Sequence, residues 1–156
     1  MQRVPQVDRW LHDIRACRYV ALDTNVVIYA LQSVEPYDAL VHHLLGFMER
    51  GFIVGTVSTV VEAEVLVKPF RELDQPAIEK ATLFFRESPH LLVRSFDRAV
   101  ARRAALVRAT TRLPLADAII IATALEERCD ALVGNDSSMA ERAIGMPYLH
   151  LDDYVS

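Results

Sequence analysis

The chain has 156 residues, of which 52% are hydrophobic and 24% charged, and its formal net charge is −4. This length fits one domain with a single core, and no apolar run approaches the roughly 20 residues that a membrane-spanning helix needs. The acidic charge argues against a protein that coats nucleic acid through bulk charge, but it suits an enzyme that holds divalent cations.

The first half of the chain alternates between predicted helices and strands. The apolar periodicity predicts a helix over Val7–Ala16, a strand over Tyr19–Leu22, helices over Thr24–Ala30 and Pro36–Arg50, a strand over Phe52–Val57 and a helix over Val60–Val67. The first strand is a continuous apolar run that stops at Asp23, which is typical of a strand buried on both faces. Ser58 or Thr59 is suited to cap the helix that follows, and Pro69 is expected to end it.

The second half continues this alternation. It predicts a helix over Asp74–Arg86, a strand over Leu91–Val93, a helix from Asp97 to about Thr110, a helix over Leu115–Arg128, a strand over Ala131–Val133, a short helix over Met139–Ile144 and an edge strand over Tyr148–Leu151. Strands that alternate with helices indicate an α/β fold with a parallel sheet and helices on both faces. No repeat or flexible linker divides the chain, so residues 1–156 are expected to form one domain.

Two aspartates are expected to converge at one edge of this sheet. Asp23 follows the first predicted strand directly, and Asp136 follows the strand over 131–133 after a short turn. Ligand sites of open parallel sheets form outside the carboxyl ends of the strands. Both carboxylates should therefore emerge at the same edge.

Two further acidic positions lie on predicted helices. Asp117 lies in the first turn of an apolar helix, where an acid can also simply complement the helix dipole. Glu62 and Glu64 are two positions apart and point to nearly opposite sides of their helix, so at most one of them can face the sheet edge. The apolar pattern alone does not decide which one does.

Carboxylates that share a site repel each other unless a cation lies between them. Oxygen ligands without a histidine or cysteine set favour Mg²⁺ or Mn²⁺, and such an ion suits hydrolysis of a phosphodiester. Cys17 and Cys129 lack metal-site spacing and are expected to be buried thiols in a reducing cytoplasm. No Ser–His–Asp or Cys–His arrangement indicates a covalent route.

Four segments, in chain order, resemble the motifs of the PIN-domain ribonucleases, and most closely those of VapC-type toxins of bacterial toxin–antitoxin pairs. They read LDTNVVIYAL, STVVEAEVLVKP, LPLADAIIIATAL and LVGND, within a resemblance that runs from Tyr19 to about Val155. It implies a three-layer α/β/α sandwich, a site for Mg²⁺ or Mn²⁺, and endonucleolytic cleavage of RNA to 5′-phosphate and 3′-hydroxyl products. It also implies a cytoplasmic homodimer and an antitoxin partner, with the helix over Pro36–Arg50 and the apolar face of Val60–Pro69 as contact regions.

The resemblance also assigns the site residues. It implies catalytic, metal-binding roles for Asp23, Glu64, Asp117 and Asp136, and it thereby selects Glu64 over Glu62. The polar positions that support the site would be Thr24, Asn25, Ser58 and Asn135. The chain departs from the family pattern at Gly134, where a threonine is usual, and in residues 1–18, a helical leader before the first strand.

An RNA substrate would need positive charge near the acidic site. Arg112 is close in sequence to Asp117 and is the expected phosphate contact. The other arginines of that region lie on the preceding helix, and a solvated helix face is their simpler interpretation: Arg98, Arg102, Arg103 and Arg108.

Other functions stay open on the sequence. The chain could be a PIN nuclease of RNA processing instead of a toxin, or a non-catalytic scaffold that binds RNA or protein, for which Gly134 is the only support. A phosphatase with Asp23 as nucleophile would want a second aspartate where Asn25 stands. A phospho-acceptor domain would want a lysine late in the chain, whereas the only lysines are Lys68 and Lys80.

Overall fold

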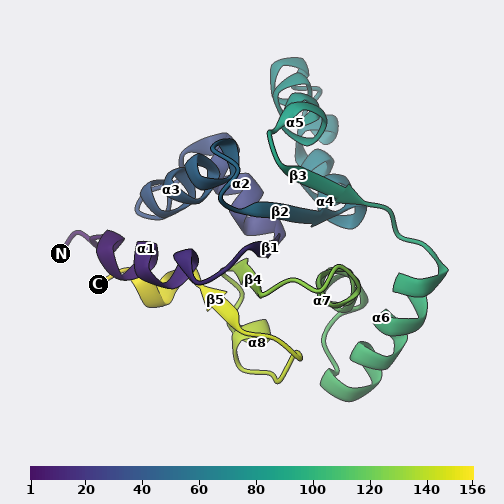
Figure 1. Cartoon of the computed structure of the whole chain (residues 1–156). Coiled ribbons are helices and arrows are strands. Elements are labelled where there is room, and N and C mark those ends of the chain that lie inside the picture. The colour runs from purple at the N-terminus through teal and green to yellow at the C-terminus, as the bar shows by residue number, and fades with distance from the viewer.

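A single sheet of five strands, in the order β3-β2-β1-β4-β5, forms the centre of the computed structural model, which describes residues 1–156 (Figure 1). The strands are β1 (Tyr19–Leu22), β2 (Val54–Ser58), β3 (Leu91–Arg94), β4 (Ala131–Gly134) and β5 (Tyr148–His150). All neighbouring strands are parallel, so their carboxyl ends meet at one edge. The predicted α/β fold with a mostly parallel sheet is confirmed.

One helix precedes the first strand, and a helix or a 3₁₀ turn follows every strand. In chain order they are α1 (Val7–Arg15), α2 (Thr24–Gln32), α3 (Asp38–Glu49), α4 (Thr59–Arg71), α5 (Gln75–Glu87), α6 (Arg98–Thr111), α7 (Leu115–Glu126), α8 (Ser137–Ala140) and the 3₁₀ turn η1 (Leu151–Tyr154). None of these helices has both the length and the apolar character required to cross a membrane.

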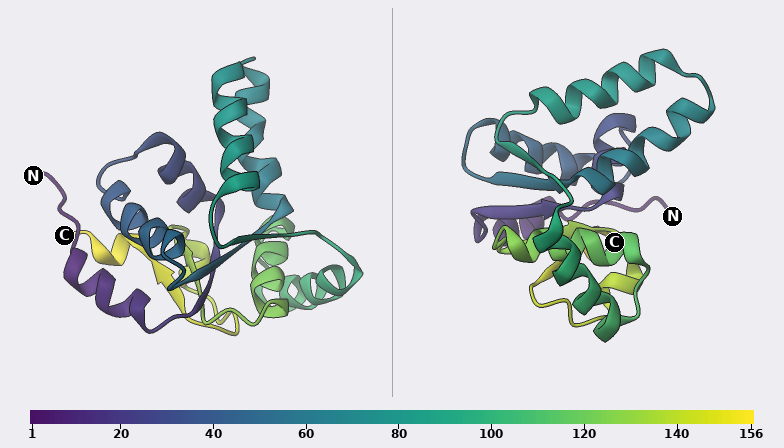
Figure 2. Two further views of the ribbon diagram at one scale, coloured as in Figure 1. Left: turned by 45° about the horizontal axis from the view of Figure 1, so that its top comes forward. Right: turned by 90° about the vertical axis from the view of Figure 1, so that its right-hand side faces the viewer.

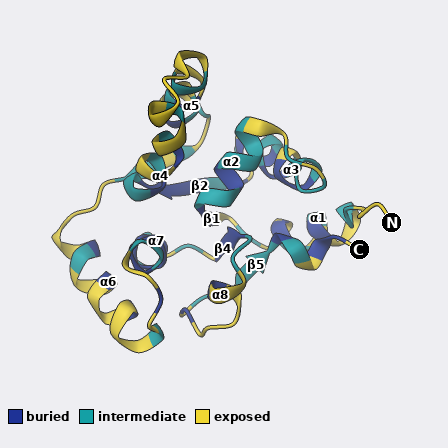
Figure 3. Cartoon of the chain, turned by 180° about the vertical axis from the view of Figure 1, so that it is seen from behind, coloured by how far each residue is buried: buried dark blue, intermediate teal, exposed yellow.

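The two faces of the sheet are buried in separate cores, which makes the sandwich three layers deep. In β1, Ala21 packs with residues of α4, α5 and α7, whereas Val20 and Leu22 pack with residues of α1 and α3. This two-sided burial explains why β1 is a continuous apolar run. The outer sides of α5 and α6 are exposed (Figure 3), and α6 packs against α7 through a small third cluster.

The residues before β1 pack into the same layer as α3. Trp10 is fully buried, its indole Nε1 donates a hydrogen bond to the Leu40 carbonyl at 2.8 Å, and its ring meets Tyr154 edge to face. Pro5 forms an antiparallel bridge with Val155, so the two ends of the chain lie side by side (Figure 1). The leader helix α1 is therefore built into the sandwich.

Several helix boundaries differ from those predicted, and two of the differences concern the end of α4 and the start of α8. Pro69 does not end α4, which runs on to Arg71, because a proline in the last turn removes only one backbone hydrogen bond. Helix α8 starts earlier than predicted, because the Asp136 carboxylate caps its first turn. With α4 thus lengthened, α4 and α5 form a hairpin that projects from the body of the sandwich (Figure 2).

Candidate active site

Asp23 lies at the carboxyl end of β1 and begins α2. Its backbone N–H donates to the Val133 carbonyl of β4 at 2.9 Å, and its Oδ1 accepts a hydrogen bond from the Thr24 N–H at 2.7 Å. Only 3% of the residue is exposed. The sheet ladder and the helix start therefore fix this carboxylate at the edge where the sequence predicted a site.

Asp136 lies beside it, after the neighbouring strand β4. Its Oδ1 accepts hydrogen bonds from the Ser138 and Met139 N–H groups at 2.8 and 3.3 Å, which caps α8. Its own backbone N–H donates to the Tyr148 hydroxyl at 2.9 Å. Hydrogen bonds therefore fix both the side chain and the backbone of Asp136.

Glu64 and Asp117 approach the same edge from two helices. The Glu64 carboxylate, in α4, accepts a hydrogen bond from Thr24 Oγ1 at 2.8 Å, which ties α4 to the start of α2. Asp117 lies in the first turn of α7, and its carboxylate forms no ion pair within the chain. Its carboxylate is therefore free to interact with the other acids.

The four carboxylates share one electrostatic environment. Burial is the largest of the effects that raise the pKa of Asp23 to about 7, and the Thr24 N–H opposes the rise. The charges of Asp117, Asp136 and Glu64 add to it. Burial also raises the pKa of Asp117 to about 6, with help from Asp136 and Glu64. The charges of Asp136 and Glu64 thus reach both Asp23 and Asp117, which brings four separate segments to a common site.

The site has a deficit of positive charge. None of the four carboxylates forms an ion pair with a basic side chain. Their hard oxygen donors fit Mg²⁺ or Mn²⁺. No three acidic, histidine or cysteine side chains are arranged as ligands of one ion. The features of the site that fit a divalent cation are therefore its negative charge and its oxygen donors.

The two hydroxyl residues predicted to support the site, Thr24 and Ser58, make different contacts. Thr24 joins Asp23 and Glu64, since its N–H bonds the first and its side chain the second. The Ser58 hydroxyl, which is buried, accepts a hydrogen bond from the Val60 N–H at 3.1 Å and caps α4. Ser58 therefore has a structural task that needs no catalytic role.

The two predicted asparagines also differ. Asn135 donates to the Tyr29 hydroxyl at 3.0 Å and accepts a hydrogen bond from the Asp152 N–H at 2.9 Å, so it ties η1 to α2 beneath the site. The side chain of Asn25 is half-buried and forms no hydrogen bond with another residue. The structure thus gives Asn135 a definite contact and Asn25 none.

Tyr148 is a residue of this site that the sequence did not single out. Burial, and then the charges of Asp23, Asp136 and Asp117, raise the pKa of its hydroxyl far above the ordinary value, so the group stays protonated. Its position depends on the pairing of β5 with β4, which no local pattern reveals. The one signal in the sequence was the missing side chain at Gly134.

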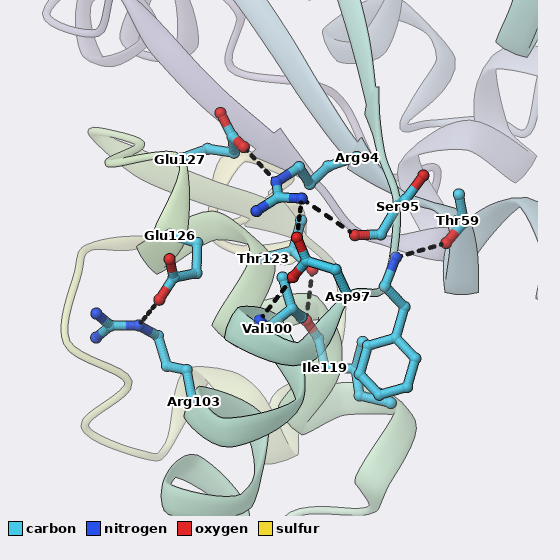
Figure 4. A network of polar contacts seen from close by, with 11 residues as sticks. Thr59, Arg94, Ser95, Asp97, Val100, Arg103, Ile119, Thr123, Glu126 and Glu127 are labelled. Atoms are coloured by element: carbon cyan, nitrogen blue, oxygen red, sulfur yellow. Dashed lines mark hydrogen bonds and ion pairs between the residues drawn. The ribbon is translucent and has the colours of Figure 1, made fainter.

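Of the arginines predicted near the site, only Arg103 forms an ion pair with a carboxylate of the chain. Arg112 is exposed at the end of α6, with a left-handed backbone (φ 60°), and its side chain makes no ion pair or hydrogen bond, so it can meet a phosphate. Arg94, which is not one of the predicted arginines, also binds carboxylates of the chain. The ion pairs of this region are Arg94–Asp97, Arg94–Glu127 and Arg103–Glu126, with N–O distances of 2.8, 2.6 and 2.6 Å (Figure 4).

Comparison with known proteins places this architecture in a family. The family model for the PIN domain matches residues 20–145, a range that contains all four carboxylates. No curated protein matches the sequence significantly. Solved structures nevertheless share the fold at low sequence identity.

Three of these structures illustrate the likeness. VapBC2 from Rickettsia felis, bound to a DNA fragment from its promoter, has 16% identity and a TM-score of 0.67 over 83% of this chain and 96% of that one. FitAcB from Neisseria gonorrhoeae has 21% identity and a TM-score of 0.63 over 85% and 97%. VapC20 from Mycobacterium tuberculosis, a toxin that cleaves the sarcin-ricin loop, has 19% identity and a TM-score of 0.61 over 82% and 99%.

The family model and the structural neighbours point to the same family. The model covers most of the chain, and the structural neighbours include toxins of VapBC toxin–antitoxin systems. The four acidic residues and strands β2, β3 and β4 lie within the matched range, which also takes in most of β1 and ends just before β5. This chain belongs to the PIN-domain family.

Proposed function

We propose that this protein is a divalent-metal-dependent endoribonuclease. The observation that carries the proposal is the set of four carboxylates at one edge of the sheet, of which Asp136 and Glu64 raise the pKa of both Asp23 and Asp117 and none has a basic partner. In this proposal Asp23, Glu64, Asp117 and Asp136 hold Mg²⁺ or Mn²⁺. The membership of the PIN-domain family supports it, because PIN domains are typically nucleases.

The chain's own residues position the substrate and the ion. A bound divalent ion would lower the pKa of water and neutralise the scissile phosphate. Asp23 and Asp136 are fixed at the ends of adjacent strands, and Thr24 orients Glu64 toward them. Arg112 supplies an unpaired guanidinium for an RNA phosphate, and hydrolysis is expected to leave a 5′-phosphate and a 3′-hydroxyl.

RNA cleavage by the purified protein tests this proposal. Cleavage is expected with Mg²⁺ or Mn²⁺ and not in excess EDTA. Asp23→Asn keeps the size of the side chain but removes its charge, so it should reduce cleavage to background; purified in parallel, it also controls for contaminating ribonucleases. Full activity of Asp23→Asn, or of the wild type in EDTA, would contradict the proposal and favour a non-catalytic scaffold.

We further propose that the nuclease is the toxin of a toxin–antitoxin pair and acts as a cytoplasmic homodimer. The α4–α5 hairpin exposes large apolar side chains that a partner could cover: Val67, Phe70, Leu73 and Leu83. A pocket of about 220 Å³ between α2, α4 and α5 has Glu64 in its wall, so an antitoxin segment seated there would reach the acidic site.

Growth of a bacterial host separates a toxin from a nuclease of RNA processing. Induced expression of the wild type should arrest growth, whereas Asp23→Asn at equal abundance should not. Normal growth with active wild-type enzyme would favour the processing nuclease.

A further inference from the structure

The space beside Gly134 is filled by the hydroxyl of another residue. Gly134 is the buried last residue of β4, and its backbone is outside the left-handed region. A Cβ at this position would overlap the Tyr148 hydroxyl and would lie 2.9 Å from the Asp23 Cβ and 3.0 Å from the Asp23 Oδ2. Glycine is therefore required here for space, and not for its conformational freedom.

The Tyr148 hydroxyl uses this space to reach Asp136. Tyr148 begins β5 opposite Leu132 of β4, and its hydroxyl passes Gly134 to accept the Asp136 N–H at 2.9 Å. The Asp136 carboxylate then caps α8. One hydroxyl therefore fixes the segment that carries Asp136.

The same hydroxyl faces Asp23. The Asp23 Oδ2 and the phenol oxygen both lie against the bare α-carbon of Gly134. The phenol oxygen accepts the hydrogen bond from the Asp136 N–H and makes none to the Asp23 carboxylate. Tyr148 thus lies between the two carboxylates that end the adjacent strands β1 and β4.

We propose that Tyr148 is a positioning residue of this site: its hydroxyl, seated against Gly134, holds Asp136 beside Asp23. The inference rests on the proposed function, because it assigns Tyr148 to the support of a metal site. Groups that orient metal ligands typically account for about 10–100-fold in metal affinity or activity.

Calorimetric titration of the RNA-free protein with Mn²⁺ tests the inference. Tyr148→Phe keeps the ring and removes the hydroxyl, so it should weaken Mn²⁺ binding by about 10–100-fold and lower kcat for RNA more than it raises KM. Tyr154→Phe is the matched control. It removes a hydroxyl that donates a hydrogen bond to the Asp13 carboxylate at 2.6 Å, in a part of the molecule away from the site. It should leave both quantities unchanged.

A second variant acts on the same contact from the other side. Gly134→Ala would crowd both the Tyr148 hydroxyl and Asp23, so it should also weaken Mn²⁺ binding. Unchanged Mn²⁺ binding by this variant would overturn the inference even if Tyr148→Phe fails to fold. The loss of Mn²⁺-binding free energy in the double variant should be smaller than the sum of the two separate losses, because both substitutions disturb the same contact of the Tyr148 hydroxyl.

The outcomes that overturn the inference are distinct. If the wild type binds Mn²⁺ and cleaves RNA while Tyr148→Phe matches it, only the role of Tyr148 is overturned. If the wild type binds no Mn²⁺, the proposed function fails and the inference fails with it.

Discussion

Asp23 combines deep burial with negative neighbours. It is 3% exposed, and Glu64, Asp117 and Asp136 all act on it without a compensating basic side chain. A buried carboxylate in such a place is stable when it is protonated or when a cation lies beside it. Protonation and metal binding should therefore compete at Asp23.

Without metal, the stability contributed by Asp23 should fall as the pH rises. Its pKa is about 7 in the folded chain and roughly 3.9 in the unfolded chain, so the folded state binds the proton more tightly. The resulting stabilisation is fully present below about pH 4 and is lost as the pH rises through about 7. The Tm of the wild type in EDTA should therefore fall between about pH 4 and pH 7, and the Tm of Asp23→Asn should fall less over the same range. An equal fall in both proteins would contradict this assignment.

At the residue scale, the sequence predicted some positions and not others. Strand-end topology was enough to place Asp23 and Asp136 at one edge. The preference for Glu64 over Glu62 needed the family resemblance, because two positions on one helix cannot be ranked without knowing which side faces the sheet. Tyr148 was missed because its position depends on a pairing between distant strands.

At the element scale, side-chain caps organise the edge of the sheet. The caps of α2, α4, α6 and α8 are Asp23, Ser58, Asp97 and Asp136. The sequence offered Ser58 or Thr59 as the cap of α4 and Asp97 as the start of α6. Asp23 and Asp136 were considered only as site residues, which is why the early start of α8 was missed.

The cap at Asp97 gives a stability prediction that is independent of the active site. The Asp97 carboxylate accepts a hydrogen bond from the Val100 N–H at 3.0 Å. Asp97→Ala should lower the free energy of unfolding measured by urea titration, whereas Asp97→Asn should retain most of it because asparagine also caps helices. Both variants lose the exposed ion pair with Arg94, so equal losses would contradict the importance of the cap.

At the scale of the whole molecule, the order of the strands builds the site. The alternation of helices and strands predicted a parallel sheet with two covered faces. It could not predict the order β3-β2-β1-β4-β5, because that order depends on contacts between segments far apart in the chain. This order puts β1 beside β4 and so brings Asp23 next to Gly134 and the segment of Asp136.

The leader helix should contribute to the stability of the whole domain. Trp10 is fully buried between α3 and the C-terminal turn, so Trp10→Ala should cost about 3–5 kcal/mol of unfolding free energy. His12→Ala, on the exposed side of α1, should change it by less than about 0.5 kcal/mol. Urea unfolding measures both, and a small loss for Trp10→Ala would show that α1 is dispensable.

The central claim is that one acidic edge of the sheet forms the metal site that cleaves RNA. The rate of Mn²⁺-dependent RNA cleavage by Glu64→Gln, beside that of Glu62→Gln, tests it most directly, because the two residues share a helix and a chemistry and only Glu64 binds Thr24. We expect Glu64→Gln to lose at least about tenfold in kcat/KM and Glu62→Gln to retain the wild-type rate. Equal rates in the two variants would contradict the account.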